Sequence, residues 1–296
     1  MRKSCLRLKD LSVEEINEIL KIAKECKCHA YDNFLINKIA INLFFEPSTR
    51  TLYSFNIAEE RLGMKVINFS PETSSINKGE SFYDTVKTFD SFNPDVLVIR
   101  SAIDEYYKEL ENRINTPILN GGDGTKDHPS QSLLDLYTIL EEFNKFEGLK
   151  VAIIGDIKHS RVAHTNIEVM KRLKMEVYTS GPIEFKEEGY EYIDIDKAIS
   201  EMDVIMLLRV QHERHQEKMG ISKEDYLKEY GLTIDKVNKM KEKAIIMHPA
   251  PFNRNVEIAD EVVESTRSRI FKQMENGVYV RMALLIRAIG DKKWKD

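Results

Sequence analysis

The sequence has few of the features that mark secreted, membrane-spanning or nucleic-acid-binding proteins. It has only three cysteines, Cys5, Cys26 and Cys28, and no C-x-x-C pair, so reduced thiols in a cytosol are favoured over a disulfide framework. It shows no apolar segment of the signal-peptide type at its start and no uncharged run of the roughly 18 residues that a membrane span needs. A net charge of −5 offers no cationic excess for neutralising nucleic-acid phosphates. We therefore expect a soluble cytoplasmic protein that binds neither nucleic acid nor membranes.

Several catalytic signatures are missing as well. Gly155 is the only glycine in its turn, so the dinucleotide-binding fingerprint is absent, and neither a P-loop nor a G-x-S-x-G motif occurs. The stretch His212-Glu213-Arg214-His215 resembles half a zinc motif, but helical ligand pairs usually lie four residues apart with further ligands nearby. We expect no metal and no cofactor.

What the chain does have is a regular alternation of strand and helix patterns. A length of 296 residues favours two domains, and 42% apolar residues suffice for folded cores. Short apolar runs predict strands at 66–69, 95–99, 151–154, 177–179, 204–208 and 244–247, and helical patterns lie between them, for example at 79–92, 130–143 and 161–173. This alternation predicts an α/β fold of two domains, each a parallel sheet flanked by helices. The polar segment 141–148 marks the boundary, and a final helix is predicted from about 276 to 289.

The octet F-F-E-P-S-T-R-T at residues 44–51 is the most informative stretch. An apolar strand pattern precedes it, Pro47 ends that pattern, and a helical stripe follows that stops at Gly63. The turn therefore places hydroxyls and Arg50 at a helix N-terminus, where unpaired N–H groups and the helix dipole favour a phosphate. The alternative is an ordinary N-cap with one surface arginine.

Basic or amide side chains recur where the other predicted strands end. Because ligands of such sheets lie beyond the carboxyl ends of the strands, this clustering in an acidic protein indicates an anionic small-molecule substrate. Each residue also has a plainer reading: Arg100 as a surface arginine, Lys78 as a solvated side chain, Arg161 as the partner of a nearby acid, and His128 as a helix-start histidine. Arg209 directly follows an apolar run, where an unpaired cation is costly, so a functional role is favoured there.

Taken together, these motifs resemble the aspartate/ornithine carbamoyltransferase family, and in particular its aspartate-specific catalytic chains. The matching stretches are F-F-E-P-S-T-R-T (44–51), K-G-E-S-F-Y-D-T (78–85), H-P-S-Q-S-L-L-D-L-Y-T-I (128–139), G-D-I-K-H-S-R (155–161), R-V-Q-H-E-R (209–214) and H-P-A-P-F-N-R-N-V-E-I (248–258). The resemblance implies transfer of the carbamoyl group of carbamoyl phosphate to L-aspartate in pyrimidine biosynthesis. It also implies a carbamoyl-phosphate-binding domain at 1–142, an aspartate-binding domain at 143–275, and a C-terminal helix at 276–296 that returns to the first domain.

The resemblance further implies a role for each matching residue. Ser48, Thr49, Arg50, Thr51 and Arg100 would hold the phosphate; Thr51, Arg100 and His128 would reach the carbamoyl oxygen; Gln131 and the backbone of Pro249, Ala250 and Pro251 would hold the carbamoyl nitrogen. Arg161 would bind the α-carboxylate of aspartate, and Arg209 with Gln211 the β-carboxylate. Ser74 and Lys78 would enter the site of a neighbouring subunit in a trimer, with Lys78 also serving aspartate. Ala250 departs from the leucine of many members, which should matter little for a backbone contact. Whether a regulatory chain binds stays open.

The residue types fit this chemistry independently of the resemblance. The two substrates bring about four negative charges, and Arg50, Lys78, Arg100, Arg161 and Arg209 provide five cations. Amine attack on a carbonyl builds an oxyanion that preplaced donors stabilise, without a protein nucleophile or a metal.

Two alternatives stay open at this stage. Ornithine carbamoyltransferase shares the S-T-R-T and H-P-x-Q stretches, but this chain has His248-Pro249-Ala250-Pro251 where that relative usually supplies a cysteine, and Arg209 suits a second carboxylate. A non-enzymatic anion-binding module would also explain a phosphate pocket alone.

Overall fold

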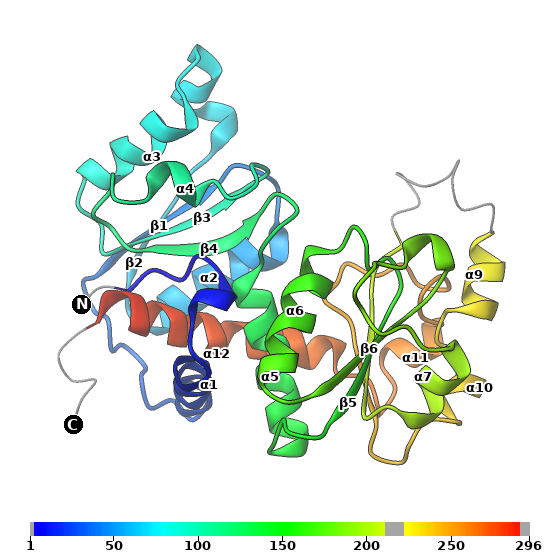
Figure 1. Cartoon of the computed structure of the whole chain (residues 1–296). Helices are drawn as coiled ribbons and strands as arrows, with labels where there is room; N and C mark the ends of the chain where they lie inside the picture. The colour runs from blue at the N-terminus through cyan, green and yellow to red at the C-terminus, as the bar shows by residue number, and fades with distance from the viewer. Residues whose placement is uncertain (1–2, 211–221, 291–296) are drawn as a thin grey trace. The chain divides into compact units, whose positions relative to one another are not determined.

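The computed structural model describes residues 3–210 and 222–290 of the chain (Figure 1). The chain divides into two compact units: unit 1 comprises 1–137 and 274–296, and unit 2 comprises 138–273. The domain limits that the sequence suggests, 1–142, 143–275 and 276–296, stay a prediction.

Unit 1 is built on a parallel sheet with the strand order β2-β1-β3-β4. Its strands are β1 (Ile39–Phe44), β2 (Lys65–Asn68), β3 (Val96–Ser101) and β4 (Ile118–Asp123). The helices connecting and flanking them are α1 (Val13–Lys27), α2 (Thr49–Arg61), α3 (Phe82–Ser91), α4 (Tyr107–Leu110), α5 (Pro129–Phe143) and α12 (Ile270–Ile289). Short 3-10 turns, η1 (Leu8–Asp10), η2 (Pro71–Thr73) and η3 (Ser75–Lys78), complete the unit.

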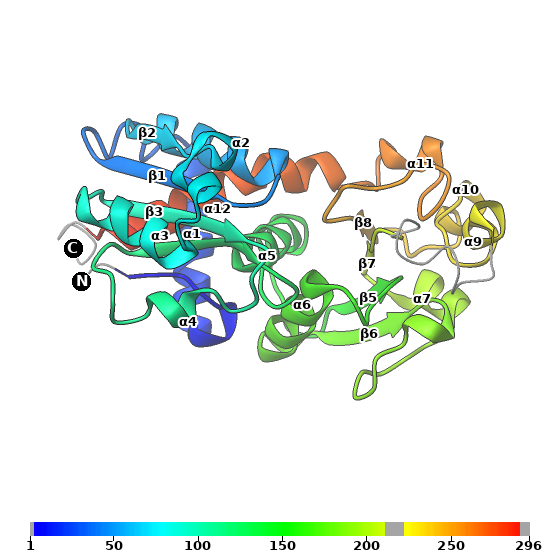
Figure 2. The ribbon, with the colours of Figure 1, turned by 90° about the horizontal axis from the view of Figure 1, so that it is seen from above.

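Helices cover both faces of this sheet. Alternate residues of β1 and β3, such as Ile41, Leu43 and Leu97, form one core cluster with Val86 of α3 and Tyr106 before α4. Figure 1 shows α3 and α4 on this face and α1 and α12 on the opposite one, as Figure 2 also shows from above. Burial on both faces explains why β3 reads as a continuous apolar run rather than an alternating one.

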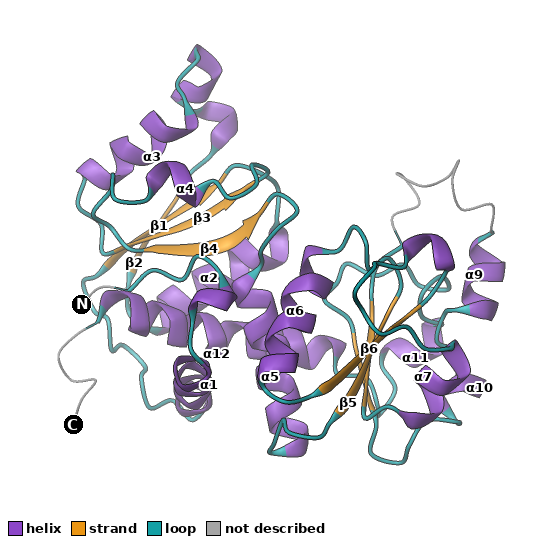
Figure 3. Ribbon diagram, in the orientation of Figure 1, coloured by secondary structure: helices purple, strands orange, loops and turns teal. Residues whose placement is uncertain are grey.

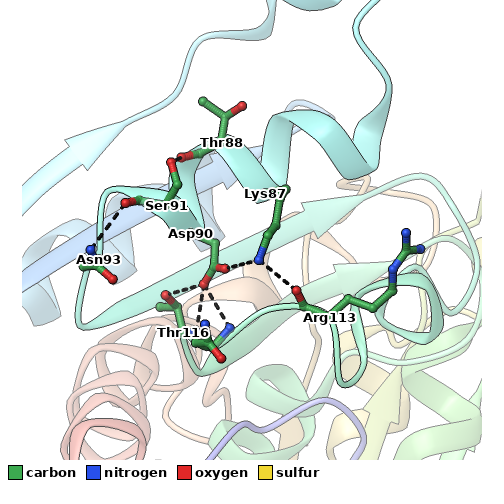
Figure 4. A network of polar contacts seen from close by, with 8 residues as sticks. Lys87, Thr88, Asp90, Ser91, Asn93, Arg113 and Thr116 are labelled. Carbon is green, nitrogen blue, oxygen red and sulfur yellow. Dashed lines mark hydrogen bonds and ion pairs between the residues drawn. The ribbon is translucent and has the colours of Figure 1, made fainter.

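A buried carboxylate ties α3 to the entrance of β4 (Figure 4). Asp90 Oδ1 accepts hydrogen bonds from the backbone N–H groups of Asn115 and Thr116 and from the Thr116 hydroxyl, at 2.9–3.0 Å. Lys87 Nζ lies 2.9 Å from Asp90 Oδ2 and also donates to the carbonyl of Arg113. Burial alone would raise the pKa of Asp90, but the hydrogen bonds from Lys87 and Thr116 outweigh it and lower that pKa.

Unit 2 repeats the arrangement with the strand order β6-β5-β7-β8, again all parallel (Figure 2). Figure 3 shows its strands in orange among purple helices. Its strands are β5 (Lys150–Ile154), β6 (Glu176–Ser180), β7 (Val204–Leu207) and β8 (Ile245–Met247). Its helices are α6 (Arg161–Arg172), α7 (Ile195–Glu201), α9 (Lys223–Glu229), α10 (Ile234–Val237) and α11 (Asp260–Val263), with the 3-10 turn η4 (Ile183–Phe185).

The C-terminal helix α12 packs back on unit 1, as the family resemblance implies. Arg287 on α12 lies 2.8 Å from Glu15 of α1, and the N–H of Lys3 donates to the carbonyl of Ala288. The predicted two-domain α/β fold is thereby confirmed. The helix begins at Ile270, about six residues earlier than predicted. Within the described residues, no helix combines the length and apolar character needed to cross a membrane.

Candidate active site

Three neighbouring strands of unit 1 end at the same edge of the sheet and carry the predicted donor-site residues. β1 leads into the S-T-R-T turn, β3 ends around Arg100, and β4 leads to His128 before α5. Because the strand order changes direction between β1 and β3, this edge is where ligands of open α/β sheets bind.

The turn after β1 presents an uncapped helix N-terminus. Ser48 is the N-cap residue of α2, yet its side chain makes no capping hydrogen bond. The N-cap serines of other helices do accept a bond from their own helix, namely Ser12, Ser81 and Ser160. Thr49 and Arg50 are exposed, whereas Thr51 is buried. The first N–H groups of α2 and its positive dipole end therefore lie among hydroxyls and a cation, an arrangement suited to an anion.

The Arg100 guanidinium is held in place by groups from both neighbouring strands. Its Nη2 lies 2.6 Å from Glu46 Oε1, and its Nη1 donates to the Gly121 carbonyl at 3.0 Å. Arg100 is 9% exposed, so its position is set by these partners rather than by solvent. Position 122 requires glycine, because its φ is 124° and a Cβ there would lie 2.8 Å from Arg100 Nη1.

His128 and Gln131 lie at the start of α5, beside Arg100. The His128 Nε2 atom is 3.3 Å from Arg100 Nη1, so two of the three predicted oxyanion donors are neighbours. Gln131 Nε2 donates to Asp135 Oδ1 at 2.9 Å, which fixes the direction of the amide. Its Oε1 then points away from Asp135 and can accept from a substrate N–H group.

Ser74 and Lys78 lie on the segment between β2 and α3. The Ser74 side chain accepts from the N–H of Ile76 and donates to the carbonyl of Pro71. Lys78 is exposed at the end of η3, and Gly79 follows it in the left-handed region at φ 91°. This segment, cyan in Figure 1, extends away from the sheet. The segment holds the two 3-10 turns η2 and η3.

In unit 2, Arg161 is the first residue of α6, directly after the turn that follows β5. Ser160 caps this helix by accepting from the N–H of Ala163 at 3.2 Å. In the same turn, the ring Nδ1 of His159 lies 2.9 Å from Asp156 Oδ1. These contacts order the turn that carries Arg161.

Arg209 comes two residues after the end of β7, and its side chain is half-buried. Its predicted companion Gln211 lies outside the described residues, as does the stretch 212–215 that resembled half a zinc motif. In the described part of the chain, no group of three or more His, Cys, Asp or Glu side chains could hold a metal ion.

The turn after β8 is held from behind by buried polar groups. His248 Nδ1 accepts from the N–H of Ala250 at 2.9 Å, and His248 Nε2 faces Glu257 at 3.4 Å. Ala250 adopts φ 55°, and its peptide bond to Pro251 is cis. Asn253 joins this turn to the Arg209 segment, because its Nδ2 donates to the carbonyl of Val210 at 3.0 Å.

Comparison with known families identifies both halves of the chain. Residues 3–141 match the carbamoyl-P binding domain of the aspartate/ornithine carbamoyltransferases, and residues 147–288 match their Asp/Orn binding domain. The chain belongs to the aspartate/ornithine carbamoyltransferase family. This confirms the resemblance drawn from the motifs and, with it, the prediction of an enzyme.

Solved structures of the family share the fold over nearly the whole chain. The catalytic subunit of M. jannaschii aspartate transcarbamoylase is 32% identical with a TM-score of 0.87 over 100% of both chains. Aspartate transcarbamoylase from Trypanosoma cruzi, in complex with carbamoyl aspartate and phosphate, is 31% identical with a TM-score of 0.85, covering 97% of this chain and 95% of that one. The same enzyme with carbamoyl phosphate and aspartate is 30% identical with a TM-score of 0.84, covering 97% and 96%.

Several residues that shape this carbamoyltransferase site were not found from sequence. Glu46 lies within the octet at 44–51, and its carboxylate contacts Arg100, a role that the motif does not indicate. Asn253 and Glu257 lie in the stretch 248–258. Asn253 contacts the distant Val210 and Glu257 faces His248, and neither contact is indicated by the local sequence pattern. A carboxylate one position before Pro47, within a turn otherwise suited to an anion, was the one available hint for Glu46.

Proposed function

We propose that the chain transfers the carbamoyl group of carbamoyl phosphate to the amine of L-aspartate, giving N-carbamoyl-L-aspartate and phosphate. The observation that carries this function is the uncapped helix N-terminus beside Arg100 and His128 within unit 1. Within unit 2, arginines follow two of the strands, which supports an acceptor that carries carboxylates. The solved relatives with carbamoyl phosphate, aspartate or carbamoyl aspartate support the same reaction. Family membership alone would also allow ornithine as the acceptor.

In the proposed donor site, the phosphate lies at the N-terminus of α2. Ser48, Thr49, Thr51 and the helix N–H groups donate hydrogen bonds, and Arg50 and Arg100 provide charge. Glu46 competes for Arg100 in the free protein at 2.6 Å, so the arriving phosphate takes over part of an existing ion pair. The fixed amide of Gln131 and the backbone at Pro249, Ala250 and Pro251 accept from the carbamoyl nitrogen.

In the proposed acceptor site, two arginines bind the two carboxylates of aspartate. Arg161 takes the α-carboxylate, and Arg209 with Gln211 takes the β-carboxylate, with Lys78 adding a further cation. Planar guanidinium groups can engage a carboxylate with two parallel hydrogen bonds, which sets both its position and its orientation. Two bound carboxylates favour aspartate over ornithine, whose side chain ends in a cation.

The proposed chemistry needs positioning and charge stabilisation more than acid or base groups. The aspartate amine attacks the carbonyl carbon, a C–N bond forms, and negative charge builds on the carbonyl oxygen. The amine passes its proton to an oxygen of the donor's own phosphate group, which leaves with it. Thr51, Arg100 and His128 stabilise the carbonyl oxygen, with Arg100 and His128 already 3.3 Å apart. The carbon–oxygen bond to phosphate then breaks, and Arg50 and Arg100 stabilise the departing phosphate.

We also propose a cytoplasmic homotrimer that works in pyrimidine biosynthesis, with Ser74 and Lys78 completing the site of a neighbouring subunit. The segment with Ser74 and Lys78 extends away from its own sheet. Exposed apolar side chains support a partner surface on the same unit: Tyr53 and Ile57 on α2, and Ile67 on the edge strand β2.

The deciding experiment is a carbamoyl-transfer assay on purified protein, with aspartate and ornithine as parallel acceptors. We expect N-carbamoyl-aspartate and phosphate in equal amounts and no citrulline. Citrulline formation would reverse the choice of acceptor. Binding of carbamoyl phosphate without turnover of either acceptor would instead support an anion-binding module.

A further inference from the structure

Arg281, in the middle of α12, is a buried cation that has no acidic partner among the residues that the structure describes. It is 3% exposed. Its Nη1 donates to the Gly277 carbonyl at 2.9 Å, and its Nη2 lies 3.5 Å from the Ser130 hydroxyl. Its guanidinium carbon lies 5.1 Å from the centre of the Phe55 ring. None of these groups carries a negative charge.

The residues around the Arg281 guanidinium leave room for it inside the fold. A Cβ at Gly277 would lie 2.5 Å from Arg281 Nη1, so the glycine leaves the space that the side chain occupies. A second buried arginine of the same helix differs in one respect: Arg287 lies 2.8 Å from the carboxylate of Glu15. Two similar side chains on one helix are therefore buried, one with an acid and one without.

Burial of an uncompensated cation lowers the folding stability of the protein when no phosphate is bound. Burial, together with the positive charge of Arg100, lowers the pKa of Arg281 to about 9. Because a guanidinium group keeps its proton under ordinary conditions, the unpaired charge stays in the fold. An anion bound nearby would remove this penalty, since charges interact strongly at low dielectric.

The contacts of Arg281 lead directly to the candidate phosphate site. Phe55 lies one helical turn after Thr51 on α2, so the guanidinium packs against the helix whose N-terminus forms that site. Ser130 is two residues after His128, at the start of α5. Arg281 thus contacts both helices that begin at the site, and the charge of Arg100 lowers its pKa.

We propose that Arg281 is a positioning residue of the carbamoyl-phosphate site, whose buried charge is compensated by the bound phosphate group instead of by a protein carboxylate. Its charge strengthens phosphate binding without a direct contact, and its side chain fixes the first turns of α2 and α5 relative to each other. The inference rests on the proposed function only for the identity of the natural ligand, because inorganic phosphate suffices to test it.

The test compares Arg281→Met with Arg287→Met, which remove a buried charge from the same helix at similar volume. Calorimetry with inorganic phosphate measures affinity, and thermal unfolding without phosphate measures stability. We expect Arg281→Met to weaken phosphate binding at least tenfold while the free protein loses no stability. Arg287→Met removes the 2.8 Å ion pair with Glu15, so we expect a lower unfolding temperature with a phosphate Kd within twofold of the parent.

Two further variants separate charge from packing. Arg281→Lys keeps the charge and should retain phosphate affinity within about threefold, whereas Arg281→Gln, a polar substitute in case the methionine variant does not fold, should lose it. In activity assays, the KM for carbamoyl phosphate should rise in Arg281→Gln while the KM for aspartate stays unchanged.

Parent-like phosphate affinity in Arg281→Met or Arg281→Gln would overturn the inference. So would a loss of phosphate affinity in Arg281→Lys as large as the loss in those two variants. A protein that binds phosphate through Arg281 but transfers no carbamoyl group would refute the proposed function alone.

Discussion

Asn42 Nδ2 lies 2.9 Å from Glu59 Oε2, and both side chains are fully buried between β1 and α2. The same nitrogen also faces the amide oxygens of Asn56 and Asn68 at 2.9 and 3.1 Å. Burial raises the pKa of Glu59 from 4.5 to about 7, although the Asn42 hydrogen bond opposes the shift. A carboxyl group that titrates near neutrality therefore lies in the helix whose first turn forms the candidate phosphate site.

This group should make stability fall as the pH rises. The folded chain binds the Glu59 proton more tightly than the unfolded chain does, so the stabilisation is complete below pH 4.5 and is lost as the pH rises to about 7. Glu59→Gln keeps an acceptor for Asn42 and cannot titrate. We expect it to exceed the parent by up to about 3 kcal/mol in free energy of unfolding at pH 8, with a much smaller difference at pH 5.

Urea denaturation at the two pH values measures this difference. Glu72→Gln, at an exposed position, serves as the control and should show no such pH-dependent gain. A constant difference between Glu59→Gln and the parent at both pH values would contradict the expected titration.

Arg209 should decide the use of aspartate without affecting the donor. Arg209→Ala removes the cation assigned to the β-carboxylate, so we expect the KM for aspartate to rise roughly 100-fold, about 3 kcal/mol. Phosphate binding, measured by calorimetry, should stay within twofold of the parent. Arg209→Lys keeps the charge but not the planar pair of donors. Its KM for aspartate should lie between that of the parent and that of Arg209→Ala. Equal loss of aspartate use and phosphate binding would count against this assignment.

Asn253 should matter because it joins two segments that carry site residues. Asn253→Ala removes the hydrogen bond to the Val210 carbonyl and should raise the KM for aspartate roughly fivefold, about 1 kcal/mol, through displacement of Arg209. Arg254→Ala, at the exposed neighbouring position, is the matched control and should change neither KM. An unchanged KM for aspartate in Asn253→Ala would show that the Arg209 segment does not need this tie.

A site shared between subunits predicts complementation of two inactive variants. Lys78→Ala and Arg50→Ala are each expected to be inactive alone. If Lys78 serves a neighbouring subunit, hybrid trimers will contain some sites with neither defect, and activity should reappear after chain exchange. Native mass spectrometry confirms that hybrids have formed. Hybrids that stay inactive would exclude the shared site and leave the carbamoyltransferase reaction unaffected.

The alternation of patterns predicted most of the fold because both sheets are parallel and buried. Strand β7 was predicted at 204–208 and spans Val204–Leu207, and α6 was predicted at 161–173 and spans Arg161–Arg172. Helix α1 was not predicted, although Ser12 and Glu15 form a capping box whose spacing is visible in the sequence. Residues at strand ends could be found because a parallel sheet gathers them at one edge.

Residues whose role depends on distant contacts could not be found in this way. Arg281 lies among the apolar positions of α12, and only the fold shows that no acid among the described residues meets it. In the sequence, Glu59 looks like an ordinary exposed charge on an amphipathic helix. Only the structure shows that it is buried against Asn42. Phe55 and Ser130 around Arg281, and Asn42 beside Glu59, come from other elements of the fold, so the local pattern does not indicate the burial of either side chain.

The position of α12 also sets the order in which the protein can be completed during synthesis. Unit 1 begins at the N-terminus, yet its core includes Ile286 and Leu285, and its buried ion pair needs Arg287. All of unit 2 must leave the ribosome before these residues do. The first unit to be made is therefore the last to be finished, and a nascent chain that stalls before residue 274 would expose the face of unit 1 that α12 covers, which makes it a ready target for chaperones.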